Sequence, residues 1–179
     1  MFRLLALNKL KKCCTVEDYR QIKNLLEEYG IEKFYKEMEK IGIFTNEQIN
    51  PINNPFAKMV LGKSSDQWEE IDEEFIVIDS NENLTHKFLV PKSLDWEYFN
   101  VLTLSKKHVP LLKRMRNTAF LYVFIHRIRK FGLFFHCYPF NTVHILHLHI
   151  VDLNAEPEFL NKNNNLKLDD VISYLESTY

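Results

Sequence analysis

The sequence predicts an α+β domain with a mainly antiparallel sheet of about five strands, one long helix and a helical extension at the N-terminus. Three observations predict this class. Helical periodicity covers residues 15–41, short strand-like runs follow from residue 74, and one long helical segment lies between those runs. The 179 residues fit one ordinary domain with a short appendage. We therefore expect a helical extension over 1–53 and an α+β domain over 54–179.

Residues 15–41 have the spacing of an amphipathic helix. Thr15 and Asp18 form the pattern of a capping box at its start. Apolar side chains recur behind them at three- and four-residue intervals, and Gly30 is expected to divide the segment into two helices. Residues 46–55 contain two prolines and four asparagines, which is typical of a linker. Residues 55–62 predict a short helix.

The second half of the chain contains the predicted strands and the long helix. The strands are expected at 74–78, 86–90, 133–138 and 143–153. The long helix is expected over 105–131, with Ser105 as N-cap, Pro110 in the first turn, and Gly132 as the residue just past the end. A short terminal helix is expected over 169–176.

Composition excludes several classes of function. The net charge is −1, so there is no strong nucleic-acid signal. The four glycines (Gly30, Gly42, Gly62 and Gly132) lie too far apart for a glycine-rich phosphate loop. If the chain binds phosphate, it does so with other groups.

The expected compartment follows from the cysteines and the apolar runs. Three scattered cysteines without a CxxC pair suit a reducing compartment. No apolar run approaches the ~20 residues of a membrane span, and no signal peptide is evident. We expect a cytoplasmic protein, with the nucleus as a second location, and no membrane partner.

Histidines are concentrated near the last predicted strand. His136, His144, His147 and His149 lie within fourteen residues of one another. Because side chains alternate along a strand, His147 and His149 should share a face with Ile145, and His144 should lie on the other. A neutral imidazole can attack a phosphorus centre, and a second one can donate to its oxygens. This pattern makes the pair candidates for catalysis.

Two other interpretations of these histidines stay open. A histidine pair on a strand can be structural or at the surface. A metal site would need a third ligand, for which Asp152 and His136 are the nearest candidates, but the sequence lacks an HExxH-type spacing. We expect neither a metal nor another cofactor. His86, His108 and His126 are interpreted as surface or helix residues.

The segment 135–151, FHCYPFNTVHILHLHIV, resembles the C-terminal motif of the histidine triad (HIT) superfamily. That motif alternates histidine with apolar residues. The segment is most similar to the branch containing the third type of histidine triad nucleotide-binding protein, which has a related form in aprataxin. Weaker similarities occur at 55–60, 78–81, 88–92, 102–112 and 166–175, so the resemblance covers about residues 55–176.

The resemblance implies a HIT-like fold and a nucleotide-binding hydrolase or nucleotidyl transferase. The reaction would resemble that of an adenosine 5′-monophosphoramidase, which acts on the α-phosphate of AMP-type conjugates through a nucleotidyl-histidine intermediate. The partner would be a purine nucleoside monophosphate or an AMP conjugate. The resemblance also implies a homodimer with the long helix at its interface.

The resemblance also assigns roles to individual residues. His147 would be the nucleophile and His149 would contact the phosphate oxygens. Thr142 would hydrogen-bond near the leaving group, and His136 would line the phosphate site. The nucleotide-binding set consists of Asp79 for the ribose hydroxyls, Phe56 and Met59 for the base, and Asn141.

The sequence departs from the family pattern at two histidines. Ile145 replaces the first histidine of the triad, and Leu94 replaces the usual histidine after Pro91-Lys92. A backbone carbonyl at position 145 survives the first change, so it could still fix the tautomer of His147. The alternative function is a catalytically weak or inactive nucleotide-binding or scaffold protein of the HIT family.

Overall fold

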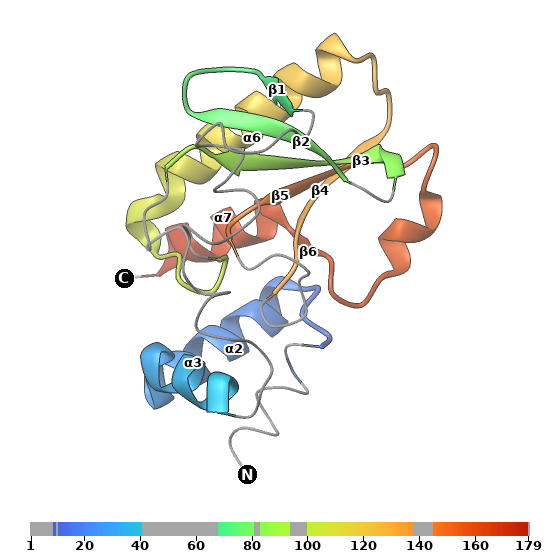
Figure 1. Ribbon diagram of the computed structural model, residues 1–179. Helices are drawn as coiled ribbons and strands as arrows, with labels where there is room; N and C mark the ends of the chain where they lie inside the picture. Colours follow the sequence, from blue (N-terminus) through green and yellow to red (C-terminus); the bar gives the residue numbers. More distant parts are fainter. Residues whose placement is uncertain are drawn as a thin grey trace.

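A six-stranded sheet forms the centre of the protein (Figure 1). The computed structural model describes residues 9, 11–40, 68–80, 83–93, 100–137 and 145–178. Neighbouring strands are antiparallel and follow the order β1-β2-β3-β5-β4-β6. Their bounds are β1 Trp68–Glu70, β2 Phe75–Ser80, β3 Asn83–Pro91, β4 Phe131–Phe135, β5 Leu148–Asp152 and β6 Leu166–Lys167. The predicted class is confirmed. The short outer strands β1 and β6 are too brief to show an alternation pattern.

The strand bounds differ from the expected ones at the histidine-rich segment. The expected strand over 143–153 is shorter, because β5 begins at Leu148, where pairing with Leu89 of β3 begins. Likewise β4 covers 131–135 rather than 133–138. The linker over 46–55 and the short helix over 55–62 lie outside the described residues.

The helices pack against one face of the sheet. They are α2 Val16–Tyr29, α3 Ile31–Lys40, α6 Val109–Ile125 and α7 Leu168–Ser177, with short 3₁₀ turns η3 Lys106–His108 and η4 Pro157–Asn161. Helix α7 contacts α6, β4 and α2. We call the covered side the helix face; Val77, Leu89 and Leu148 lie opposite one another on it and join α6 in one buried core.

The other side of the sheet carries the candidate histidines, and we call it the histidine face. Ile78 is paired with Phe88, Phe88 with His149, and His149 with Phe134. Directly paired residues of an antiparallel sheet point to the same side. These four side chains therefore form one row across four strands.

The N-terminal helices are built into the same core as the sheet. The capping box of Thr15 and Asp18 is present, and Gly30 separates α2 from α3 with a φ of 90°. Tyr19, Ile22 and Leu26 of α2 are buried in the core that contains the helix face. The Tyr19 hydroxyl donates to the Val101 carbonyl at 2.7 Å. The predicted extension is thus helical, and it packs directly on the domain that follows.

The long helix ends earlier than expected. A 3₁₀ turn precedes it, and α6 stops at Ile125 because the chain adopts a left-handed conformation at Arg127 (φ 54°). The Arg127 N–H donates to the Phe124 carbonyl and the Ile128 N–H to the Val123 carbonyl, the pattern of a Schellman motif. This turn lets Ile128 and Phe131 pack against the core. The expectation of Gly132 as C-terminal cap is wrong, since Gly132 lies in β4.

Part of α6 is exposed and apolar. Phe120 and Leu121 are each 46% exposed, Ile125 is 53% exposed and Phe124 is 81% exposed. Within the described ranges, no helix combines the length and hydropathy needed to cross a membrane.

Candidate active site

His147 and His149 lie side by side on the histidine face. Their ring centroids are 4.8 Å apart, and both side chains are buried. His149 belongs to β5, whereas His147 lies in the irregular backbone directly before that strand. Ile145 packs with Ile76, Ile78 and Val90 of the same face. The predicted shared face of His147, His149 and Ile145 is therefore present.

The backbone carbonyl of Ile145 fixes the tautomer of His147. His147 Nδ1 lies 2.7 Å from this oxygen. A carbonyl can only accept, so Nδ1 carries the proton and donates it, which leaves the lone pair on Nε2. The carbonyl at position 145 thus makes this contact although the residue is isoleucine.

His149 is the central member of a cluster of four imidazoles, which we call the histidine cluster (His86, His136, His147 and His149). Its Nδ1 lies 2.7 Å from His86 Nε2, and its ring centroid lies 3.9 Å from that of His136. Its Nε2 is buried and has no hydrogen-bond partner among the described residues. Since a buried polar atom without a partner is costly, this atom is the natural contact for a ligand.

His136 is held beside His149 by the segment between β5 and β6. His136 Nε2 donates to Asn165 Oδ1 at 2.8 Å, and Asn165 Nδ2 donates to the Phe159 carbonyl. The structure thus brings together three of the predicted site residues, which are His136, His147 and His149.

Burial favours the neutral form of three members of the cluster, His86, His136 and His149, because it lowers the pKa of each. It lowers the pKa of His86 to about 4, and the charges of His136 and Lys162 add to the effect. Burial, followed by the three neighbouring imidazoles and Lys162, lowers the pKa of His149 well below its usual value. Burial also lowers the pKa of His136, although the hydrogen bond that His136 donates to Asn165 acts to raise it. A neutral imidazole at cellular pH is the form that can act as a nucleophile.

His86 is the member of the histidine cluster that sequence reasoning missed. It was expected at the surface or in a helix, but it lies in β3 opposite Val151, with its ring against Phe88, His149 and Phe159. Alternation along the predicted strand would place His86 on one face with Phe88 and Val90. That alternation does not show which strand pairs with β3, so the sequence could not predict that His86 lies next to His149.

Asp79 is not brought to the histidines. It is paired with Lys87, one position after the Ile78–Phe88 pair, and so points to the helix face. Its carboxylate lies 2.5 Å from Lys87 Nζ. It also acts on Tyr122 of α6, whose pKa is raised to about 12 by burial, Glu69 and Asp79. The other predicted site residues, Thr142, Asn141, Phe56 and Met59, lie outside the described residues.

Residues 53–165, well over half of the chain, match the family described as scavenger mRNA decapping enzyme C-term binding. The chain belongs to this decapping-enzyme C-terminal family. No curated protein sequence matches it.

Solved structures of histidine triad proteins are similar to this family member. A histidine triad protein from Clostridium difficile has 16% identity and a TM-score of 0.50, and covers 56% of this chain and 90% of its own. A HIT family hydrolase from Clostridium thermocellum has 21% identity and a TM-score of 0.49 over the same shares. The first likeness shows the HIT fold. The chain therefore has the fold of a family whose members are generally nucleotide-binding hydrolases or nucleotidyl transferases.

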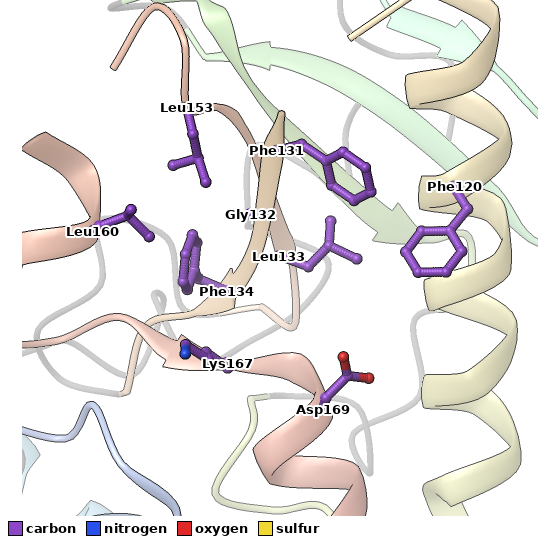
Figure 2. A pocket seen from close by; sticks show the side chains of 9 residues that line it. All are labelled: Phe120, Phe131, Gly132, Leu133, Phe134, Leu153, Leu160, Lys167 and Asp169. Carbon is purple, nitrogen blue, oxygen red and sulfur yellow. The ribbon is translucent and has the colours of Figure 1, made fainter. Parts of the chain in front are cut away.

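A separate apolar pocket of about 360 Å³ lies along β4. Figure 2 shows Phe134, Leu153 and Leu160 on one side of the strand and Phe120, Phe131 and Leu133 on the other. Gly132 lies in its floor, where an added Cβ would be 2.2 Å from the Phe134 ring. No histidine lines this pocket. In the described part of the chain, no three His, Cys, Asp or Glu side chains are arranged to hold a metal ion.

The lowered pKa values of His86, His136 and His149 make the stability of the protein depend on pH. Unfolded histidines take up protons near pH 6.5, whereas folded His86 does so only near pH 4. The contribution of these histidines to the free energy of unfolding is therefore complete above pH 6.5. It is lost as the pH falls from 6.5 toward 4. Over this range, each fully buried imidazole changes the free energy of unfolding by up to about 1.4 kcal/mol per pH unit. The partly exposed His86 changes it by less. Urea unfolding at pH 7.5, 6.0 and 5.0 measures this slope.

The variant His86→Gln is the control for the pH effect, because it removes one of these groups and leaves the carboxylates unchanged. Its slope should be smaller than that of the wild type over the same range. Equal slopes in the two proteins would show that the cluster does not cause the loss.

Proposed function

We propose that this protein is a nucleotide-binding hydrolase or nucleotidyl transferase that acts on the α-phosphate of AMP-type conjugates, in the manner of an adenosine 5′-monophosphoramidase. The observation that carries the proposal is the 2.7 Å contact of His147 Nδ1 with the Ile145 carbonyl. It places the lone pair of Nε2 on the histidine face beside the unpartnered Nε2 of His149.

The proposed reaction has two steps. The His147 Nε2 lone pair forms a bond to phosphorus while the bond to the leaving group breaks, and the leaving group takes up a proton from solvent water. The Nδ1–H donates to the Ile145 carbonyl and so stabilises the positive imidazolium formed in this step. Water then cleaves the N–P bond, releases the nucleoside monophosphate and restores the imidazole.

His149 supplies a hydrogen bond to the phosphate in this proposal. If His86 Nε2 donates to His149 Nδ1, the proton of His149 is on Nε2 and points to the ligand. A phosphate oxygen would then satisfy the one buried polar side-chain atom that lacks a partner in the described chain. His136 lines the same site. Thr142, Asn141, Phe56 and Met59 complete it by the resemblance to the family motif.

A second candidate is a nucleotide-binding or scaffold protein with little activity. The observation that favours it is Ile145, which packs into an apolar cluster and brings no imidazole to the site. The expected homodimer belongs to either candidate, and the exposed apolar side of α6 supports it.

Mass spectrometry of a trapped intermediate separates these candidates. The protein is mixed with a fluorogenic AMP-amide, quenched in alkali and digested. An adduct with the mass of AMP on His147, together with fluorophore release, is the expected result. Tight AMP binding without an adduct or release would overturn the hydrolase in favour of the binding protein.

A further inference from the structure

The thiols of Cys13 and Cys137 meet inside the core, although the two residues lie far apart in the chain. Both side chains are fully buried and reduced, and both belong to the core that contains the helix face. The hydrogen bond between the two thiols, followed by burial, raises the pKa of Cys13 above its usual value. The contact thus stabilises the protonated form of Cys13, which donates to the Cys137 sulfur.

Cys13 is held in place by the capping box at the start of α2. Asp18 Oδ2 accepts hydrogen bonds from the backbone N–H groups of Cys14 and Thr15, at 3.3 and 3.0 Å. These bonds fix the backbone directly after Cys13. Helix α2 contacts β6, the outermost strand on this side of the sheet, and α7 (Figure 1). The N-terminal extension therefore presents Cys13 to the sheet from an anchored position.

Cys137 is held on the opposite side of the contact by the last strands. Phe135 ends β4 and is paired with Leu166 of β6. The next residue, His136, donates from Nε2 to Asn165 Oδ1 at 2.8 Å. Cys137 directly follows these two contacts. Because both segments are anchored, the two sulfur atoms need only move from hydrogen-bond contact to the roughly 2 Å of an S–S bond.

We propose that Cys13 and Cys137 are an oxidative modification site, at which hydrogen peroxide produces a disulfide that joins the N-terminal extension to the sheet. In the first step, one thiol sulfur bonds to a peroxide oxygen while the O–O bond breaks, which gives a sulfenic acid and one water. In the second step, the other thiol sulfur bonds to the sulfenic sulfur, and the departing hydroxyl takes the thiol proton as a second water. Two thiols are oxidised and one peroxide is reduced. The site does not depend on the proposed function.

Burial determines how fast this site reacts. The thiolate is the reactive form of cysteine, and the raised pKa keeps Cys13 protonated. Peroxide should therefore react when the start of α2 opens locally, and the disulfide should form when the segment closes again. Burial then shields the disulfide from reducing thiols. Cys14 is the alternative target, because it is partly exposed and its Sγ contacts Asp18 Oδ2 at 3.8 Å.

Peptide mapping of the intact chain after peroxide treatment tests the site. The folded protein is kept with excess hydrogen peroxide for hours, its remaining thiols are alkylated, and it is digested without reduction. The expected product is a peptide pair linked through Cys13 and Cys137, with Cys14 alkylated. Cys14→Ser is the matched control and should form the same link at a similar rate. A link through Cys14, or oxidation confined to Cys14, would overturn the proposal.

Thermal unfolding measures whether the disulfide joins the extension to the sheet. The midpoint of the oxidised protein should be about 5–15 °C above that of the reduced protein, because the cross-link closes a long loop and restricts the unfolded chain. Cys137→Ala should show no such rise after the same treatment, and it also reports any effect of peroxide on other side chains. The wild-type comparison decides the outcome if this variant does not fold. An unchanged midpoint in wild-type protein that contains the link would overturn the proposed joining of the extension to the sheet.

Discussion

Replacing His147 with asparagine should lower the hydrolysis rate of an AMP-amide by more than about 10⁴-fold, because the reaction loses its covalent nucleophile. Asparagine has a similar size and polarity, but no atom that can form a stable bond to phosphorus. AMP affinity should change much less than the rate, since His149 and His136 remain. Stopped-time assays of fluorophore release give the rate, and calorimetry gives the affinity.

The matched control for this variant is His126→Asn. His126 is exposed at the end of α6 and lies 3.0 Å from Glu69, away from the histidine face. Its replacement should leave the rate within about twofold of the wild type. Substantial hydrolysis by His147→Asn would place the nucleophile elsewhere, while a change in affinity with no measurable wild-type rate would favour the binding protein.

Replacing Tyr19 with alanine should destabilise the whole protein by about 3–5 kcal/mol, as for other large aromatic residues removed from a core. The Tyr19 side chain is fully buried, its ring packs edge-on against Tyr174 of α7 at 5.2 Å, and its hydroxyl donates to the Val101 carbonyl. One side chain thus joins the N-terminal extension to two parts of the following domain. Urea unfolding followed by circular dichroism measures the free energy.

Two companion variants divide this effect into its causes. Tyr19→Phe keeps the ring and leaves the Val101 carbonyl without its donor, which should cost about 1 kcal/mol. Val16→Ala lies on the exposed side of the same helix and should change stability by less than about 0.5 kcal/mol. A separate early transition in Tyr19→Ala, with the remaining unfolding unchanged, would show that the extension folds independently of the sheet.

The elements that the sequence predicted well are those set by local patterns. The Thr15–Asp18 capping box and the break at Gly30 depend on residues within one or two helical turns, and both are present. The shared face of His147 and His149 depends only on alternation along one segment. The carbonyl of residue 145 performs its task whatever the side chain, so the loss of a histidine there does not alter the contact.

The long helix shows where local patterns mislead. Gly132 was the natural terminator by residue type, yet Arg127 adopts the left-handed conformation instead. A non-glycine residue in that conformation costs about 1 kcal/mol. Burial of Ile128 and Phe131 against the core offsets this cost. No local sequence pattern predicts that burial.

The sequence by itself determined the α+β class, the helical extension and the pair of histidines on one face, because these follow from periodicity and capping over a few residues. Only the tertiary structure decided the composition of the site. Pairing of β3 with β5 brings His86 to His149, and the strand register turns Asp79 toward α6. The segment after β5 folds back to place Phe159 beside the imidazoles, with Lys162 over the Phe159 ring. These contacts join residues far apart in the chain, and their partners are set by the register of the sheet and the packing of its two faces.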